Sequence, residues 1–79
     1  MTIYMYQGEA YTEEALYELL LSEITGDDIM ELVFPELRPD TYFLFDYFSD
    51  DYKLNFRDKA IERIMSGEEE VTRYHLIEV

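Results

Sequence analysis

The stretch TEEALYELLLSEITGDDIMEL, residues 12–32, decides how the first half of this chain folds. Its apolar residues recur at three- and four-residue spacing, at Ala15, Leu16, Leu19, Leu20 and Ile24. This is the pattern of a helix that buries one side. Thr12 stands before the pattern as a candidate N-cap, and carboxylates at Glu13 and Glu14 suit the positive end of a helix dipole. Gly26 is predicted to end this helix, because glycine readily takes the positive φ of a helix C-terminus.

The segments that follow predict further helices. Asp27 or Asp28 is the candidate cap of a second, short helix, IMELVF at residues 29–34, which Pro35 ends. The run TYFLFDYF, residues 41–48, is ambiguous, because its aromatic density suits a strand whereas Asp40 can cap a helix. The choice favoured here is a helix.

The two ends of the chain predict strands. Residues 2–6, TIYMY, are rich in β-formers and stop at a Gln-Gly pair, and the tail VTRYHLIEV, residues 71–79, alternates. Between them, residues 52–65 predict a helix whose buried stripe includes Ile61 and Ile64 and which stops at Gly67. We therefore predict one domain, residues 1–79, of the α+β class: a small single-layer antiparallel sheet from the N- and C-terminal strands, packed with two to four helices.

Composition narrows the range of functions. The 79 residues include no Cys, which excludes disulfides and thiolate metal sites and suits a reducing compartment. Neither a signal peptide nor an apolar run long enough to span a membrane is recognisable, so a cytoplasmic location is expected. With one histidine, His75, expected to be structural, and no calcium-binding loop, no metal or other cofactor is predicted. No phosphate loop or nucleophile motif stands in the sequence, so we expect a non-enzyme.

Acidic residues are concentrated in one part of the chain. The formal net charge is −13, from 19 acids and 6 bases. Residues 1–52 contain 13 acids and one base, a net of −12, whereas residues 53–79 contain 6 acids and 5 bases, a net of −1. A merely solubilising surface would mix both signs and would need a smaller net charge, roughly 2 to 8 in magnitude. The asymmetry therefore predicts an anionic face for a basic partner, and it disfavours nucleic acid or anionic membrane as a direct ligand.

The spacing of the acids supports this interpretation. Glu14 and Glu18 lie four residues apart, as do Asp27 and Glu31, so each pair would stack on one helix face about 6 Å apart along the axis. Proteins that hold DNA use Lys and Arg clusters against rows of phosphates, and carboxylates at comparable spacing can occupy such clusters. In this respect the segment from Glu9 to Asp51 resembles the small acidic DNA-mimic proteins of phages and mobile elements, including anti-CRISPR and antirestriction proteins.

That resemblance implies an inhibitor which blocks the basic nucleic-acid-binding site of a host defence or DNA-handling protein. The acids expected to act as phosphate surrogates are Glu9, Glu13, Glu14, Glu18, Glu23, Asp27, Asp28 and Glu31, with Asp40, Asp46, Asp50 and Asp51 extending the face. Two alternatives stay open: an adaptor or antitoxin-like module that recognises a basic partner without nucleic-acid competition, and a self-associating protein, for instance a homodimer. The aromatic run, with Tyr52 and Phe56 after it, is expected in the core, and Tyr4, Tyr6, Tyr11 and Tyr17 are candidates for exposure.

Overall fold

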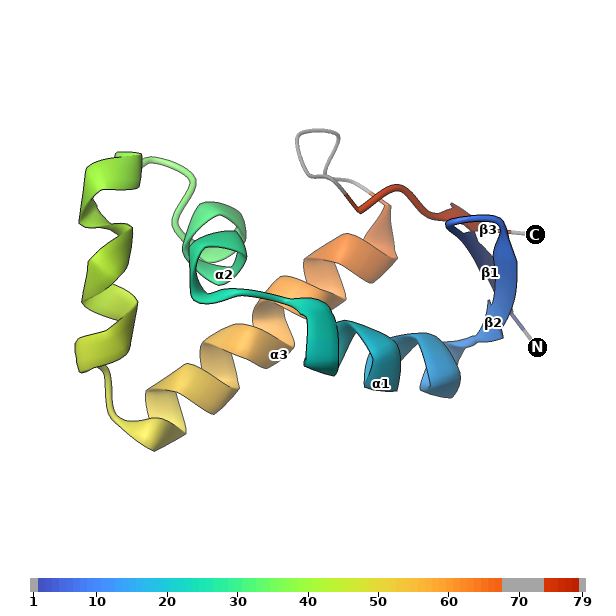
Figure 1. Cartoon of the computed structure of the whole chain (residues 1–79), viewed down its shortest axis with the longest axis horizontal. Coiled ribbons are helices and arrows are strands. Elements are labelled where there is room, and N and C mark those ends of the chain that lie inside the picture. The colour runs from blue at the N-terminus through green and yellow to red at the C-terminus, as the bar shows by residue number, and fades with distance from the viewer. Residues whose placement is uncertain (1, 68–73, 79) are drawn as a thin grey trace.

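The computed structural model describes residues 2–67 and 74–78, which form a three-stranded antiparallel sheet and four helices. The α+β class and the antiparallel sheet built from both ends of the chain are thus confirmed. The body is elongated, with extents of 37 × 24 × 16 Å. Figure 1 shows the sheet at one end of the long axis and the segment around residues 39–47 at the other.

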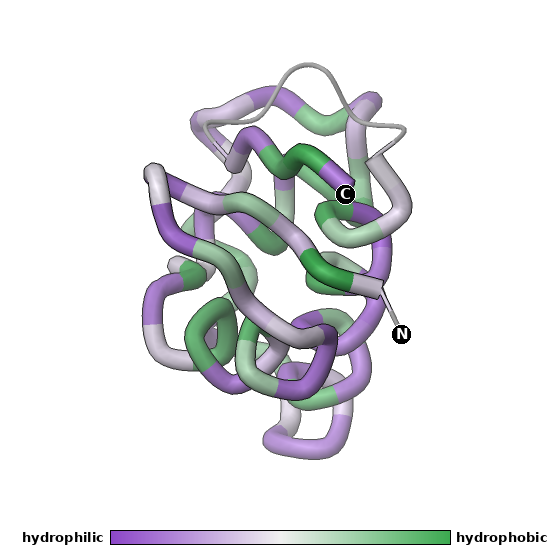
Figure 2. Tube along the Cα trace, turned by 90° about the vertical axis from the view of Figure 1, so that its right-hand side faces the viewer, coloured by the Kyte–Doolittle hydropathy of each residue, from purple (hydrophilic) through white to green (hydrophobic). Residues whose placement is uncertain are grey.

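The sheet has the order β2-β1-β3. Strand β1, Ile3–Tyr6, pairs with β2, Glu9–Thr12, through a two-residue turn, and with β3, Ile77–Glu78. Gln7 and Gly8 both have positive φ, +50° and +82°, as a tight hairpin turn of the right twist requires. Figure 2 is turned so that the sheet lies in front of the helices.

Strand β2 was missed by the sequence analysis, which ended the first strand at the Gln-Gly pair and continued directly to the helix. At the other end, the predicted strand over residues 71–79 is observed only at β3, while residues 71–73 and 79 lie outside the described part of the chain. The pairing of the C-terminal strand with the first strand is confirmed.

Helix α1, Glu13–Glu23, begins as predicted, because the Thr12 side chain accepts a hydrogen bond from the backbone N–H of Ala15. Its end was predicted wrongly, since the helix stops at Glu23 with Ile24 as its C-cap. Gly26 is instead the first residue of α2, Gly26–Val33. An added Cβ at Gly26 would lie 2.9 Å from Cδ2 of Phe45, so the close approach of that ring, rather than a positive φ, requires glycine here.

The predicted cap of α2 is also wrong. Thr25, not Asp27 or Asp28, is the N-cap, and it forms a reciprocal capping box with Asp28. Helix α3, Asp50–Ser66, confirms the helix predicted over residues 52–65. Ser49 caps its start, and Gly67 takes the left-handed conformation, φ +74°, at its end.

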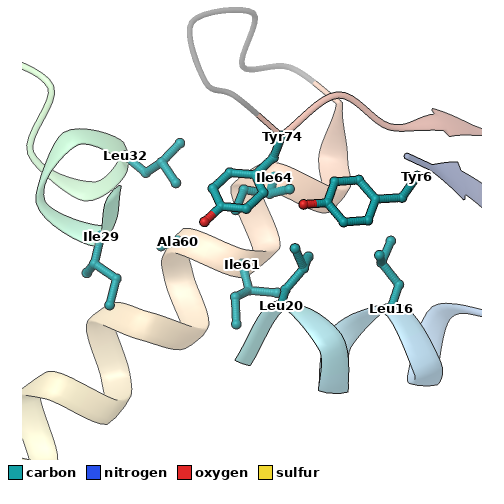
Figure 3. Packing of buried hydrophobic residues seen from close by; sticks show 9 residues of the cluster. All are labelled: Tyr6, Leu16, Leu20, Ile29, Leu32, Ala60, Ile61, Ile64 and Tyr74. Carbon is teal, nitrogen blue, oxygen red and sulfur yellow. The ribbon is translucent and has the colours of Figure 1, made fainter. Parts of the chain in front are cut away.

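The core joins the helices to the sheet. Figure 3 shows Leu16 and Leu20 of α1 facing Ile61 and Ile64 of α3, with Tyr6 on the same side. Further buried residues are Ile29, Met30 and Leu32 of α2, Ala60 of α3, and Tyr74. The rings of Tyr6 and Tyr74 stack with centroids 6.4 Å apart. Tyr6 was a candidate for exposure, and this prediction is wrong because its side chain is buried.

The aromatic run is helical, as favoured, but it forms a 3-10 helix, η1, Pro39–Tyr47, whose N-cap is Arg38 rather than Asp40. Its repeat of three residues per turn explains why the prediction of a buried run is wrong. Every third residue, at Tyr42, Phe45 and Phe48, is half-buried against the body, while none of the run is fully buried. Tyr52, which was also expected in the core, is exposed.

Candidate partner-binding surface

A groove of about 980 Å³ lies between α1, α3 and the first strand. Its lining consists of Tyr4, Thr12, Glu13, Glu14, Ala15, Tyr17, Glu18, Glu62 and Met65. Among the described residues, this lining holds four carboxylates and no base. We call it the acidic groove.

Local structure fixes three of these carboxylates. The Thr12 cap sets the first turn of α1, which places Glu13 and Glu14 where the N-terminal end of the helix dipole stabilises negative charge. Glu18 follows Glu14 by four residues in the same helix, so the two side chains stack about 6 Å apart along the axis, as predicted. All three are exposed, so their charges are available to a partner.

The fourth carboxylate, Glu62, comes from α3 and was not among the predicted residues. Arg63 follows it and Lys59 stands three positions before it, so charge counting places Glu62 in the balanced part of the chain. It reaches the groove only because α3 packs beside α1, and no local sequence signal reports that packing. Tyr4 and Met65 likewise reach the groove only through tertiary packing.

The two tyrosines of the groove stay neutral at physiological pH. Burial, followed by the negative charge of Glu13, raises the pKa of Tyr4. The hydroxyl of Tyr17 donates a hydrogen bond to Asp58, and this bond is the main cause of the raised pKa of Tyr17. The groove therefore combines carboxylates with neutral rings, which provide apolar contact area and one end that can hydrogen-bond.

A second pair of acids, Glu9 of β2 and Glu23 at the end of α1, is hydrogen-bonded to tyrosines of the hairpin. Glu9 accepts a hydrogen bond of 2.8 Å from the hydroxyl of Tyr11, and Glu23 accepts one of 2.9 Å from Tyr6. The bond to Glu9 and the charges of both carboxylates raise the pKa of Tyr11. Glu9 and Glu23 are thus close to the same ring although they are 14 positions apart in the sequence.

On α2, the predicted acids have different surroundings. Asp27 and Glu31 are exposed and lie four residues apart in the helix. Asp28 is half-buried and accepts hydrogen bonds from the backbone N–H of Thr25 and from the hydroxyl of Tyr74, at 3.2 and 2.7 Å. Asp28 therefore holds α2 to the C-terminal segment, and this structural role explains the carboxylate without a contact to another protein.

The remaining predicted acids lie toward the end of the molecule that is opposite the sheet (Figure 1). Asp40 and Asp46 belong to η1, and Asp50 and Asp51 form the first turn of α3. Arg38 Nε lies 3.8 Å from Asp40. The positive end of the helix dipole stabilises carboxylates in a first turn, and this offsets part of the repulsion between Asp50 and Asp51. The structure thus brings Glu13, Glu14 and Glu18 together in the acidic groove and distributes the other predicted acids over separate surfaces.

The described part of the chain contains neither a cluster of metal ligands nor a membrane-spanning helix. In residues 2–67 and 74–78, no group of three or more His, Asp or Glu side chains has an arrangement that could hold a metal ion. Within the same ranges, none of the helices has the length and apolar character needed to cross a membrane.

In comparisons with known proteins, no family model, curated protein or solved structure matches this chain.

Proposed function

We propose that this protein is an acidic nucleic-acid mimic that binds and blocks the basic nucleic-acid-binding site of a host defence or DNA-handling protein. It acts by occlusion, without catalysis and without a cofactor, in the cytoplasm of the cell in which a phage or mobile element expresses it. The observation that carries the proposal is the acidic groove, whose described lining holds four carboxylates and no base.

Electrostatics supports this choice of partner. A net charge of −13 on 79 residues attracts basic surfaces and repels nucleic acid itself. The paired carboxylates of Glu14 and Glu18 have a spacing comparable to that of phosphates along a nucleic-acid strand. Tyr4 and Tyr17 add apolar area next to them, and tyrosine is enriched in protein interfaces. A partner that normally grips a polyanion with Lys and Arg would meet both features here.

The acids have different roles in the proposed complex. Glu13, Glu14, Glu18 and Glu62 contact Lys and Arg of the partner directly. Glu9, Glu23, Asp27 and Glu31 extend the negative potential around that contact and raise the association rate. Asp28 contributes through the stability of α2 rather than through the interface.

The test compares two matched variants in a capture experiment from host lysate. In one variant, Glu14→Gln and Glu18→Gln remove two charges from the groove. In the control, Glu36→Gln and Asp51→Asn remove two charges from exposed positions outside it. We expect the unmodified chain and the control to capture the same nucleic-acid-binding protein, and the groove variant to lose it. Equal loss in both variants would show that total charge, rather than the groove, determines binding and would refute the placement.

A second candidate function is an adaptor that binds a basic protein while nucleic acid stays in place. The observation that favours it is the exposure of large apolar residues on η1, far from the acidic groove. Competition distinguishes the two functions, because nucleic acid displaces a mimic from its partner but leaves an adaptor bound.

A further inference from the structure

The outward side of η1 carries three large apolar residues that the fold leaves exposed. Phe43, Leu44 and Tyr47 have 59%, 41% and 80% of their surface accessible. With three residues per turn, Phe43 lies in one outward row with Asp40 and Asp46, and Leu44 and Tyr47 lie in the adjacent row. The rings of Phe43 and Tyr47 contact each other edge to face, with centroids 6.3 Å apart. We call Phe43, Leu44 and Tyr47 the η1 outer face.

The fold does not need this face. The third, inward row attaches η1 to the body: the Phe45 ring lies against Gly26 of α2, and Phe48 contacts Phe56 of α3 with centroids 5.3 Å apart. Phe45 and Phe48 also contact each other. The rings of Phe43 and Tyr47 add little to this packing, because more than half of the surface of each remains in water, and Leu44 also stays exposed. Isolated exposed apolar residues are common, but neighbouring ones on one element mark an interaction surface.

The position of the face separates it from the acidic groove. Figure 1 shows η1 at the end of the molecule opposite the sheet, whereas the groove is lined by Tyr4 of β1 and by the start of α1. The long axis of the molecule measures 37 Å. A partner element on the η1 outer face therefore does not fill the groove, and the two surfaces can be tested independently.

The charges around the face select the chemistry of its partner. Asp40 and Asp46 lie on either side of Phe43 in its row, about 6 Å away along the axis at a rise of roughly 2 Å per residue. Asp50 and Asp51 follow at the start of α3. Two bases, Arg38 beside Asp40 and Lys53 over the Phe45 ring, stand against these four carboxylates. The rim of the face is therefore acidic.

We propose that the η1 outer face docks an amphipathic helix of a partner protein, one whose apolar stripe is flanked by Lys and Arg. The nine residues of η1 span about 18 Å, which matches roughly three turns of an α-helix. A second copy of this chain is the wrong occupant, because it would bring Asp46, Asp50 and Asp51 against their own equivalents in a protein of net charge −13. This inference holds whether or not the acidic groove imitates nucleic acid.

The test is an NMR titration of the isotope-labelled chain with three synthetic helical peptides. The first has a Leu and Trp stripe flanked by Lys and Arg, the second has the same stripe flanked by Glu, and the third has Lys and Arg without the stripe. We expect the first peptide to shift the amide signals of residues 40–47 and to bind at least about tenfold more tightly than the other two.

Paired variants make the assignment specific. Phe43→Ser with Tyr47→Ser should weaken the first peptide by about tenfold or more. Leu54→Ser with Ile77→Ser, which removes two other exposed apolar side chains, should leave its affinity unchanged. Shifts confined to the lining of the acidic groove would overturn the proposal, and so would equal binding of the peptide without a stripe. Self-association of the free chain that disappears in the Phe43 and Tyr47 variant would show that the occupant is a second copy, which also contradicts it.

Discussion

Replacing Asp28 by alanine should destabilise the protein far more than replacing its neighbour Asp27. Both residues lie in the first turn of α2, so the loss of a favourable interaction with the helix dipole, about 0.3–1 kcal/mol, is common to both variants. Asp27 is exposed, whereas Asp28 completes the capping box of Thr25 and accepts a hydrogen bond from Tyr74. The difference between the two variants therefore includes the loss of these two hydrogen bonds.

The expected magnitude follows from these contacts. The capping bond contributes about 0.5–1 kcal/mol to the free energy of unfolding. The bond from Tyr74 to a charged acceptor contributes about 1.5–3 kcal/mol, because the Tyr74 side chain is buried and would lose a partner that water cannot readily replace. Asp28→Ala should thus be about 2–4 kcal/mol less stable than Asp27→Ala. For a domain of this size, the melting temperature should be lower by roughly 10 °C or more.

Urea unfolding followed by circular dichroism measures this difference as a shift of the midpoint at constant slope. Tyr74→Phe serves as the control, because it removes the hydrogen bond from Tyr74 to Asp28 and leaves the capping bond of Asp28 in place. The double variant, Asp28→Ala with Tyr74→Phe, should then lose less free energy of unfolding than the sum of the losses in the two single variants, because both changes remove the same interaction. Free energies of unfolding for Asp28→Ala and Asp27→Ala that agree within about 0.5 kcal/mol would refute the structural role of Asp28.

Three further predictions follow from individual contacts. Gly26→Ala should lower the free energy of unfolding by about 1 kcal/mol or more, since its Cβ would lie 2.9 Å from the Phe45 ring, and an unchanged or higher free energy of unfolding would contradict the close approach. Tyr17 has a raised pKa in the folded state, so its stabilising effect is complete below the ordinary value of 10.0 and is lost as the pH rises through the folded value. The Tyr17→Phe variant should therefore lose less stability than the unmodified chain over that alkaline range in urea titrations, and parallel losses would count against the bond to Asp58. Adding salt should raise the urea midpoint of the unmodified chain, because screening weakens the mutual repulsion of its acids, and a midpoint that falls with salt would mean that attractive pairs dominate.

Much of the fold could be predicted because local signals agree with tertiary structure in α1 and α3. Thr12 and Ser49 are good caps, and Gly67 supplies the positive φ that ends α3. The apolar spacing also identified the buried faces, as Leu16, Leu20, Ile61 and Ile64 show. These features depend on residues within a few positions of one another.

The errors occurred where distant contacts decide between local alternatives. Gly26 follows α1 at a suitable distance for a C-cap, but the capping box of Thr25 and the Phe45 ring place it at the start of α2. The run at residues 41–48 is apolar at nearly every position, so its composition cannot distinguish a repeat of three from a repeat of two or 3.6. Only contact with Gly26 and Phe56 defines which of its rings face inward.

The candidate surface shows the same division. Glu13, Glu14 and Glu18 could be predicted because one helix and its cap place them. Glu62 could not, since it joins them only through the packing of α3 beside α1. Asp28 was predicted as a surface acid because the sequence does not reveal that Tyr74, 46 positions later, donates to it.

The most direct test of nucleic-acid mimicry is competition on the purified partner. The chain is labelled and bound to the protein that it captures, and its release is followed by fluorescence anisotropy as duplex DNA or RNA is added at constant ionic strength. Mimicry predicts that nucleic acid releases the chain completely, and that more nucleic acid is needed for half-release when more of the chain is present. A chain that stays bound while the partner also binds nucleic acid would contradict mimicry.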